Sequence, residues 1–124
     1  MGNVGINKVM ITGNLTSDPE RRTTPDGTPV CDMRVAIPTR TKAGDEACFI
    51  NVVAWDKQAD SCANYLHRGS WVLVEGRLKL NEWQSKQGEK RSKISIVAHK
   101  VLFLSVADRP ANREENEQAS NPEG

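Results

Sequence analysis

The chain has 124 residues, of which 37% are hydrophobic and 27% are charged, and its formal net charge at pH 7 is +1. This length suits one domain with its own core, and the balanced charge excludes a strongly basic or strongly acidic protein. No apolar run approaches the ~20 residues of a membrane-spanning helix, and the first ten residues lack the apolar centre of a signal peptide. We therefore expect a cytoplasmic protein.

The charge is unevenly distributed along the chain. Residues 1–107 carry 15 Lys or Arg and 11 Asp or Glu, whereas residues 108–124 carry two basic and five acidic residues. From Asp108 onward the sequence is mostly polar and has no hydrophobic periodicity. This pattern predicts a folded domain over residues 1–107 and a disordered acidic tail over residues 108–124.

Residues with catalytic or metal-binding chemistry are few. The three cysteines, Cys31, Cys48 and Cys62, form no Cys-x-x-Cys pair, which predicts small buried thiols in a reducing compartment. His67 and His99 are isolated, and there is no Gly-rich phosphate loop and no cluster with metal-ligand spacing. We expect no enzyme, no metal and no cofactor.

Alternating apolar and polar residues predict the elements in chain order. The first strand is expected within residues 6–15, a loop over 17–30 follows, and the second strand covers 30–39. A short loop over 40–46 leads to a third strand over 47–55. A helix is expected over 57–67, because Ala59, Cys62, Ala63 and Leu66 recur at helical spacing. The fourth and fifth strands are expected over 71–80 and 93–104. Five strands with a helix between the third and the fourth predict an all-β OB-fold barrel.

Two stretches contain aromatic residues outside the expected core. On the third strand Phe49, Asn51, Val53 and Trp55 share one face, and Ile50, Val52 and Ala54 share the other. Both faces are apolar, so the face of Phe49 and Trp55 either stacks a ligand or packs on the helix or a partner chain. Trp83 lies in a basic hairpin with Lys86, Lys90, Arg91 and Lys93 against only Glu82 and Glu89. Aromatic rings beside cations suit single-stranded nucleic acid, whose bases stack and whose phosphates need positive charge.

Four segments of the chain resemble one known family. The stretches NKVMITGNLTSDPE, FINVVAW and YLHRGSWVLVEGRL and the Trp83 hairpin are similar to the bacterial single-stranded DNA-binding proteins, which are homotetrameric OB-fold proteins. The resemblance covers about residues 4–105. It implies binding of single-stranded DNA without sequence specificity during replication, recombination and repair, at the nucleoid. A dimeric primosome-type OB-fold protein and an OB-fold protein-interaction module are the alternatives.

The resemblance also implies site residues. Phe49, Trp55 and Trp83 match the stacking aromatics of the family, and cations are expected at phosphate contacts: Lys8, Arg22, Arg34, Lys57, Arg68, Lys79, Lys86, Lys90 and Arg91. The family often has another tryptophan near Arg40, which is missing here, so fewer bases are expected to stack. Its tail usually ends in an acidic, hydrophobic tip that recruits replication and repair proteins. This chain ends QASNPEG, which leaves such partners open.

The fourth strand predicts an assembly surface. Val72, Val74, Gly76, Leu78 and Leu80 share the face expected to line the barrel. Trp71 and Leu73 then point outward, and such a pair marks an interface unless the tail or the helix covers it. A homotetramer is therefore expected.

Overall fold

The computed structural model describes residues 2–107 of the chain. Within this range it contains one helix and six strands, in the order β1 (Val9–Leu15), β2 (Glu20–Thr23), β3 (Pro29–Thr41), β4 (Gly44–Trp55), α1 (Asp56–Tyr65), β5 (Trp71–Gln84) and β6 (Lys90–Ser105). The predicted tail, 108–124, lies outside the described residues.

The strands form one closed sheet. Their order is β1-β5-β6-β4-β3-β2, and β1 also pairs with β3, so the sheet curls into a barrel. All pairs are antiparallel except β4 with β6, which run parallel from Asn51 opposite Ser95 to Val53 opposite Val97. The helix follows β4 and precedes β5, which are the third and fourth strands of the prediction. The all-β OB-fold prediction is therefore confirmed.

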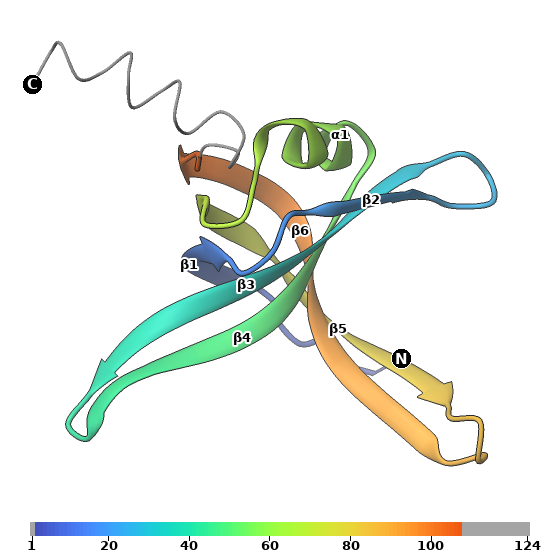
Figure 1. The fold of residues 1–124 in the computed structure, drawn as a ribbon. Helices are drawn as coiled ribbons and strands as arrows, with labels where there is room; N and C mark the ends of the chain where they lie inside the picture. The colour runs from blue at the N-terminus through green and yellow to red at the C-terminus, as the bar shows by residue number, and fades with distance from the viewer. Residues whose placement is uncertain (1, 108–124) are drawn as a thin grey trace, which may run out of the picture.

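The core lies inside the barrel and under the helix. Leu15, Val35, Val52, Val74 and Ile96 are at most 1% exposed, and each comes from a different strand. On α1 the buried side chains are Ala59 and Cys62, with Leu66 just after the helix, so the apolar face of the helix closes one end of the barrel (Figure 1). No helix within residues 2–107 is long and apolar enough to cross a bilayer.

One predicted loop contains a strand. Residues 20–23 form β2, which pairs with β3 from Glu20 opposite Asp32 to Thr23 opposite Pro29. All four residues of β2 are exposed, so no alternation of apolar and polar side chains marks the strand. Backbone pairing with β3 defines it instead, and β2 and β3 form the arm at the right of Figure 1.

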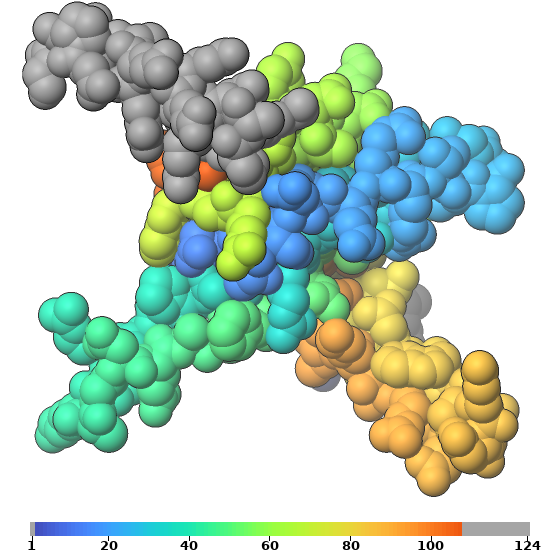
Figure 2. All heavy atoms as spheres, viewed as in Figure 1, coloured from blue at the N-terminus to red at the C-terminus, as the bar shows by residue number. Residues whose placement is uncertain are grey.

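The prediction that Leu78 and Leu80 line the barrel is wrong. Val72 and Val74 are fully buried, but Leu78 is 41% and Leu80 55% exposed. The pairing of β6 with β4 ends at Ser95, which lies opposite Lys79, and beyond this level β5 and β6 continue as a separate pair to Gln84 and Lys90. The hairpin of β3 and β4 extends in the same way, and both project as arms from the body of the molecule (Figures 1 and 2). Their side chains alternate between two faces without a core beneath them.

The three thiols differ in their surroundings. Burial raises the pKa of Cys31 to about 11 and that of Cys62 to about 12, because a thiolate in an apolar core is poorly solvated. Cys48 is exposed on the β3–β4 hairpin, so the prediction of a buried thiol is wrong there. The reason is again that the hairpin extends beyond the core.

Candidate nucleic-acid interface

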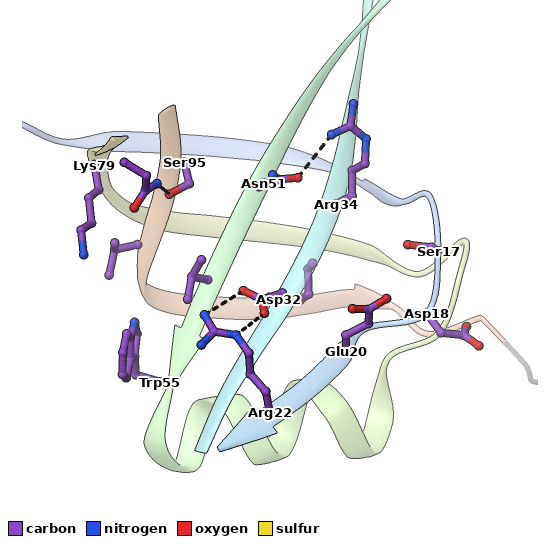
Figure 3. Close-up of a pocket in the computed structure, with 14 residues that line it drawn as sticks. Ser17, Asp18, Glu20, Arg22, Asp32, Arg34, Asn51, Trp55, Lys79 and Ser95 are labelled. Atoms are coloured by element: carbon purple, nitrogen blue, oxygen red, sulfur yellow. Dashed lines mark hydrogen bonds and ion pairs between the residues drawn. The ribbon is translucent and has the colours of Figure 1, made fainter. Parts of the chain in front are cut away.

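A groove runs across the strands on the outside of the barrel. Its volume is about 410 Å³. Five strands, β2 to β6, and the segment from β1 to β2 supply its lining residues, which are Ser17, Asp18, Glu20, Arg22, Asp32, Met33, Arg34, Asn51, Val53, Trp55, Lys79, Asn81, Ser95 and Val97. Figure 3 shows Trp55 and Lys79 on one side of the groove and Asp18 and Glu20 on the other. The groove therefore has an aromatic, basic side and an acidic side.

The outer face of β4 presents the two predicted aromatic residues of this strand. Phe49 is 52% and Trp55 38% exposed, whereas Val52 and Ala54 between them are buried. Asn51 and Val53, on the same face as the two rings, line the groove. Six residues of extended chain separate the rings, which is about 20 Å. This face is thus open to a ligand and is not packed on the helix.

The β5–β6 hairpin turns one face toward the groove. Lys79, Asn81 and Ser95 line the groove, and the Asn81 amide donates to Ser95 Oγ at 3.0 Å. Along the same face, Asn81 lies opposite Lys93 and Trp83 opposite Arg91. Because side chains at every second position share a face, Trp83, Arg91 and Lys93 extend the groove along the arm. Trp83 is 49% exposed.

Arg34 joins the groove to the ring of Phe49. Its guanidinium lies 5.4 Å from the Phe49 ring centroid, which is a cation–π distance. The same guanidinium donates to the Asn51 side-chain oxygen at 3.3 Å. These two contacts, of which Figure 3 shows the one with Asn51, orient a planar cation between the exposed ring and the groove.

Arg22 lies in the groove but is already paired. Its Nε donates to Asp32 Oδ2 at 2.6 Å and its terminal nitrogen to Oδ1 at 3.4 Å (Figure 3). The hydrogen bond with Asp32 raises the pKa of Arg22 above its ordinary value. A phosphate at this position would have to compete with Asp32 for the guanidinium.

Three other predicted phosphate contacts also form ion pairs. Lys8 pairs with Glu75 at 3.3 Å, Lys90 with Glu82 at 3.2 Å and Arg91 with Glu89 at 3.0 Å. Lys90 and Glu82 lie on the other face of the hairpin, which points away from Trp83. The structure therefore brings Arg91, but not Lys90, to the side of the hairpin that carries Trp83. Lys8 lies outside the groove lining.

The remaining predicted cations form no ion pair within residues 2–107. Lys79 faces the groove, and Lys57 lines a second, shallower hollow on the first turn of α1. Lys86 lies in the turn between β5 and β6. Arg68 lies between α1 and β5, where its backbone N–H donates to Asp18.

Four polar residues of this surface were not predicted as site residues. Asn51, Asn81 and Ser95 line the groove, and Lys93 shares the face of Trp83. Asn51 on the face of Phe49 and Trp55, and Lys93 in the Trp83 hairpin, were visible in the sequence, but the register of β5 against β6 is needed to place Asn81, Lys93 and Ser95 on one face with Trp83. Within residues 2–107 no group of three or more His, Cys, Asp or Glu side chains could hold a metal ion.

A second exposed surface lies on the outer face of the β1–β5–β6 sheet, around Trp71 and Leu73. Trp71 is 39% exposed and Leu73 is partly exposed, as predicted for an outward face. Leu73 lies opposite Leu102 on β6 and opposite Thr12 on β1. We call the exposed apolar side chains here the outer patch, which consists of Met10, Trp71, Leu73, Leu102 and Leu104.

Known proteins resemble the chain over almost its whole length. Single-stranded DNA-binding protein 2 of Chlorobaculum tepidum is 38% identical, over 91% of this chain and 79% of the relative. Single-stranded DNA-binding protein 3 of Clostridium acetobutylicum is 40% identical, over 94% and 83%. The single-stranded DNA-binding protein of Helicobacter hepaticus is 39% identical, over 93% and 71%. The sequence profile of the single-strand binding protein family matches residues 6–104. The chain therefore belongs to the single-strand binding protein family.

Proposed function

We propose that this protein binds single-stranded DNA without sequence specificity and protects it during replication, recombination and repair. The observation that carries the proposal is one continuous surface, from the groove to the β5–β6 arm, on which Trp55 and Trp83 lie among cations and amides. The names and similarity of the relatives support the same ligand. The protein acts as a binder and not as an enzyme.

The chemistry of the surface explains why sequence does not matter. Every base has an aromatic face, so stacking on Phe49, Trp55 or Trp83 accepts all four bases, and each stack contributes ~1–3 kcal/mol. Lys79, Arg34 and further cations attract the phosphates, which are the same in every sequence. The side-chain amides of Asn51 and Asn81 in the groove can bond to the edges of bases. Because a single strand is flexible, any base can turn to meet such an amide, so these bonds select no sequence.

The acidic residues of the groove set a limit on the affinity. Asp18 and Glu20 lie on one side of the groove, away from Lys79 (Figure 3). Phosphates are repelled from that side and follow the side of Trp55 and Lys79. Of the predicted contacts, Lys57 and Lys86 extend this path, whereas Lys8 and Lys90 lie apart from it and Arg68 lies beside Asp18 on the acidic side.

We propose that the protein assembles into a homotetramer through the outer patch. Exposed Trp, Leu and Met side chains that gather on one sheet face are typical of protein interfaces. No residue of the outer patch lines the groove, so a second copy that covers the patch leaves the groove open. Several copies also give one strand several aromatic surfaces in succession.

A titration with labelled oligothymidine at two salt concentrations tests the proposed function. We expect tight binding to the single strand, weak binding to a duplex of the same length, and affinity that falls steeply with salt because counterions are released. Equal affinity for duplex would contradict the proposal, and no binding to either would favour a protein-interaction module. Light scattering of the same sample reports the assembly, and a stable dimer would favour the primosome-type alternative.

A further inference from the structure

The groove ends at Trp55, where the chain leaves the barrel. Trp55 lies opposite Val30 of β3, but the parallel pairing of β4 with β6 ends two residues earlier, at Val53 and Val97. The next residue, Asp56, has a φ of 60°, and no side chain caps the start of α1. Strand pairing therefore holds Trp55 on the β3 side only.

On the other side, β6 carries a bulge. Glu75 lies opposite Lys100 and Gly76 opposite Ala98, so His99 has no partner on β5. An extra residue of this kind bends a strand and removes backbone groups from the ladder. The bulge lies just beyond the last parallel pair, Val53 with Val97, at the level where β4 turns into the helix.

The side chain of Gln58 bridges this bulge. Its Nε2 donates to the carbonyl oxygen of Ala98 at 3.4 Å, and its Oε1 accepts from the N–H of Val101 at 2.9 Å. The N–H of Val101 can only meet the amide oxygen, so the orientation of the amide is determined by its partners. Gln58 is half-buried and lies in the first turn of α1, three residues after Trp55. One amide thus replaces the missing strand pairing between the end of β4 and β6.

We propose that Gln58 is a positioning residue for DNA binding, which holds Trp55 in place at the end of the groove. This inference rests on the proposed function. The indole of Trp55 forms no hydrogen bond with any residue in the range 2–107, so the backbone on either side decides where the ring lies. Trp55, Gln58, Ala98 and His99 also line one common hollow, which places the ring next to the bridge. The ion pair of Arg21 with Asp60 ties the helix to β2, and Gln58 ties it to β6.

The test is a double-mutant cycle with fluorescence anisotropy of labelled oligothymidine. Gln58→Met keeps the length of the side chain and removes both hydrogen bonds. We expect it to weaken binding by roughly fivefold in the parent, which is within the range for coupled neighbours. In a Trp55→Ala background the same substitution should change the affinity by less than about 1.5-fold, because the ring it positions is gone. In a Trp83→Ala background the full effect should remain. Gln84→Met makes the same chemical change on the face of the hairpin that points away from Trp83, and it serves as the control.

The outcomes separate this inference from the proposed function. A parent that does not bind oligothymidine would overturn both. If the parent binds and Gln58→Met weakens it equally in all three backgrounds, the residue acts through general stability and the positioning role is refuted. Should Gln58→Met fail to fold, Gln58→Glu, which keeps the acceptor for Val101, replaces it in the same cycle. Hydrogen exchange of the parent gives an independent check, since an unprotected Val101 amide would show that the bridge does not form.

Discussion

Asp32 holds Arg22, a predicted phosphate contact, and removing the charge of Asp32 should strengthen DNA binding. In the free protein Arg22 is held by Asp32 through hydrogen bonds at 2.6 and 3.4 Å. Both side chains are about half exposed, so the pair contributes only ~0.2–1 kcal/mol to stability. The substitution Asp32→Asn keeps the size of the side chain and frees the guanidinium for a phosphate. We expect tighter binding and a change in the free energy of unfolding below ~1 kcal/mol.

The gain in affinity has two parts. Competition with Asp32 costs a phosphate about 0.5 kcal/mol, the middle of the range for exposed pairs. A phosphate bound to Arg22 would also lie on the order of 6 Å from the carboxylate, where two like charges in water repel by about 0.7 kcal/mol. Together these give about 1 kcal/mol, or roughly fivefold tighter binding to oligothymidine at low salt. One additional phosphate contact should steepen the slope of log K against log salt by about 0.7.

Asp45→Asn is the matched control for this substitution. Asp45 pairs with Arg40 at 3.5 Å near the tip of the β3–β4 hairpin, and its loss changes the net charge by the same amount. Because the site is remote from the groove and exposed, we expect less than about a twofold effect. Adding Arg22→Gln to Asp32→Asn should abolish the gain. Unchanged affinity and slope for Asp32→Asn, or an equal gain from Asp45→Asn, would refute the reasoning.

Three further outcomes can be measured directly. Trp83→Ala should weaken binding to oligothymidine by about 1–3 kcal/mol without loss of far-UV circular dichroism, and a folded variant with parental affinity would exclude the hairpin from the site. The double substitution Trp71→Glu, Leu73→Glu should shift the light-scattering mass from a tetramer to smaller species, because it places charges in the outer patch. A parent that is already monomeric would contradict that assembly. Iodoacetamide at pH 8 should modify one thiol per folded chain, Cys48, and three after denaturation, since burial keeps the other two thiols protonated. Rapid modification of more than one thiol in the folded protein would argue against this core.

Alternation was enough to predict five of the six strands, and on β4 it also separated the core face from the outer face. Val52 and Ala54 face the core and Phe49 and Trp55 face outward, as predicted, because a pleated strand must send alternate residues to opposite sides. The order of strands and helix then indicated the OB-fold. These features are local and repeat every two residues, so they are visible in the sequence by itself.

Tertiary structure decided the rest, since it depends on contacts between residues distant in sequence. Alternation assigned Leu78 and Leu80 to one face but could not show that both are exposed near the point where the β5–β6 hairpin extends beyond the pairing of β4 with β6. Strand β2 has no buried residue and exists only through its pairing with β3. A cation is available to DNA only if no acidic side chain on a neighbouring strand pairs with it, as Asp32 on β3 pairs with Arg22 on β2. A charged side chain looks the same in any sequence, and its nearest opposite charge is set only when the barrel closes.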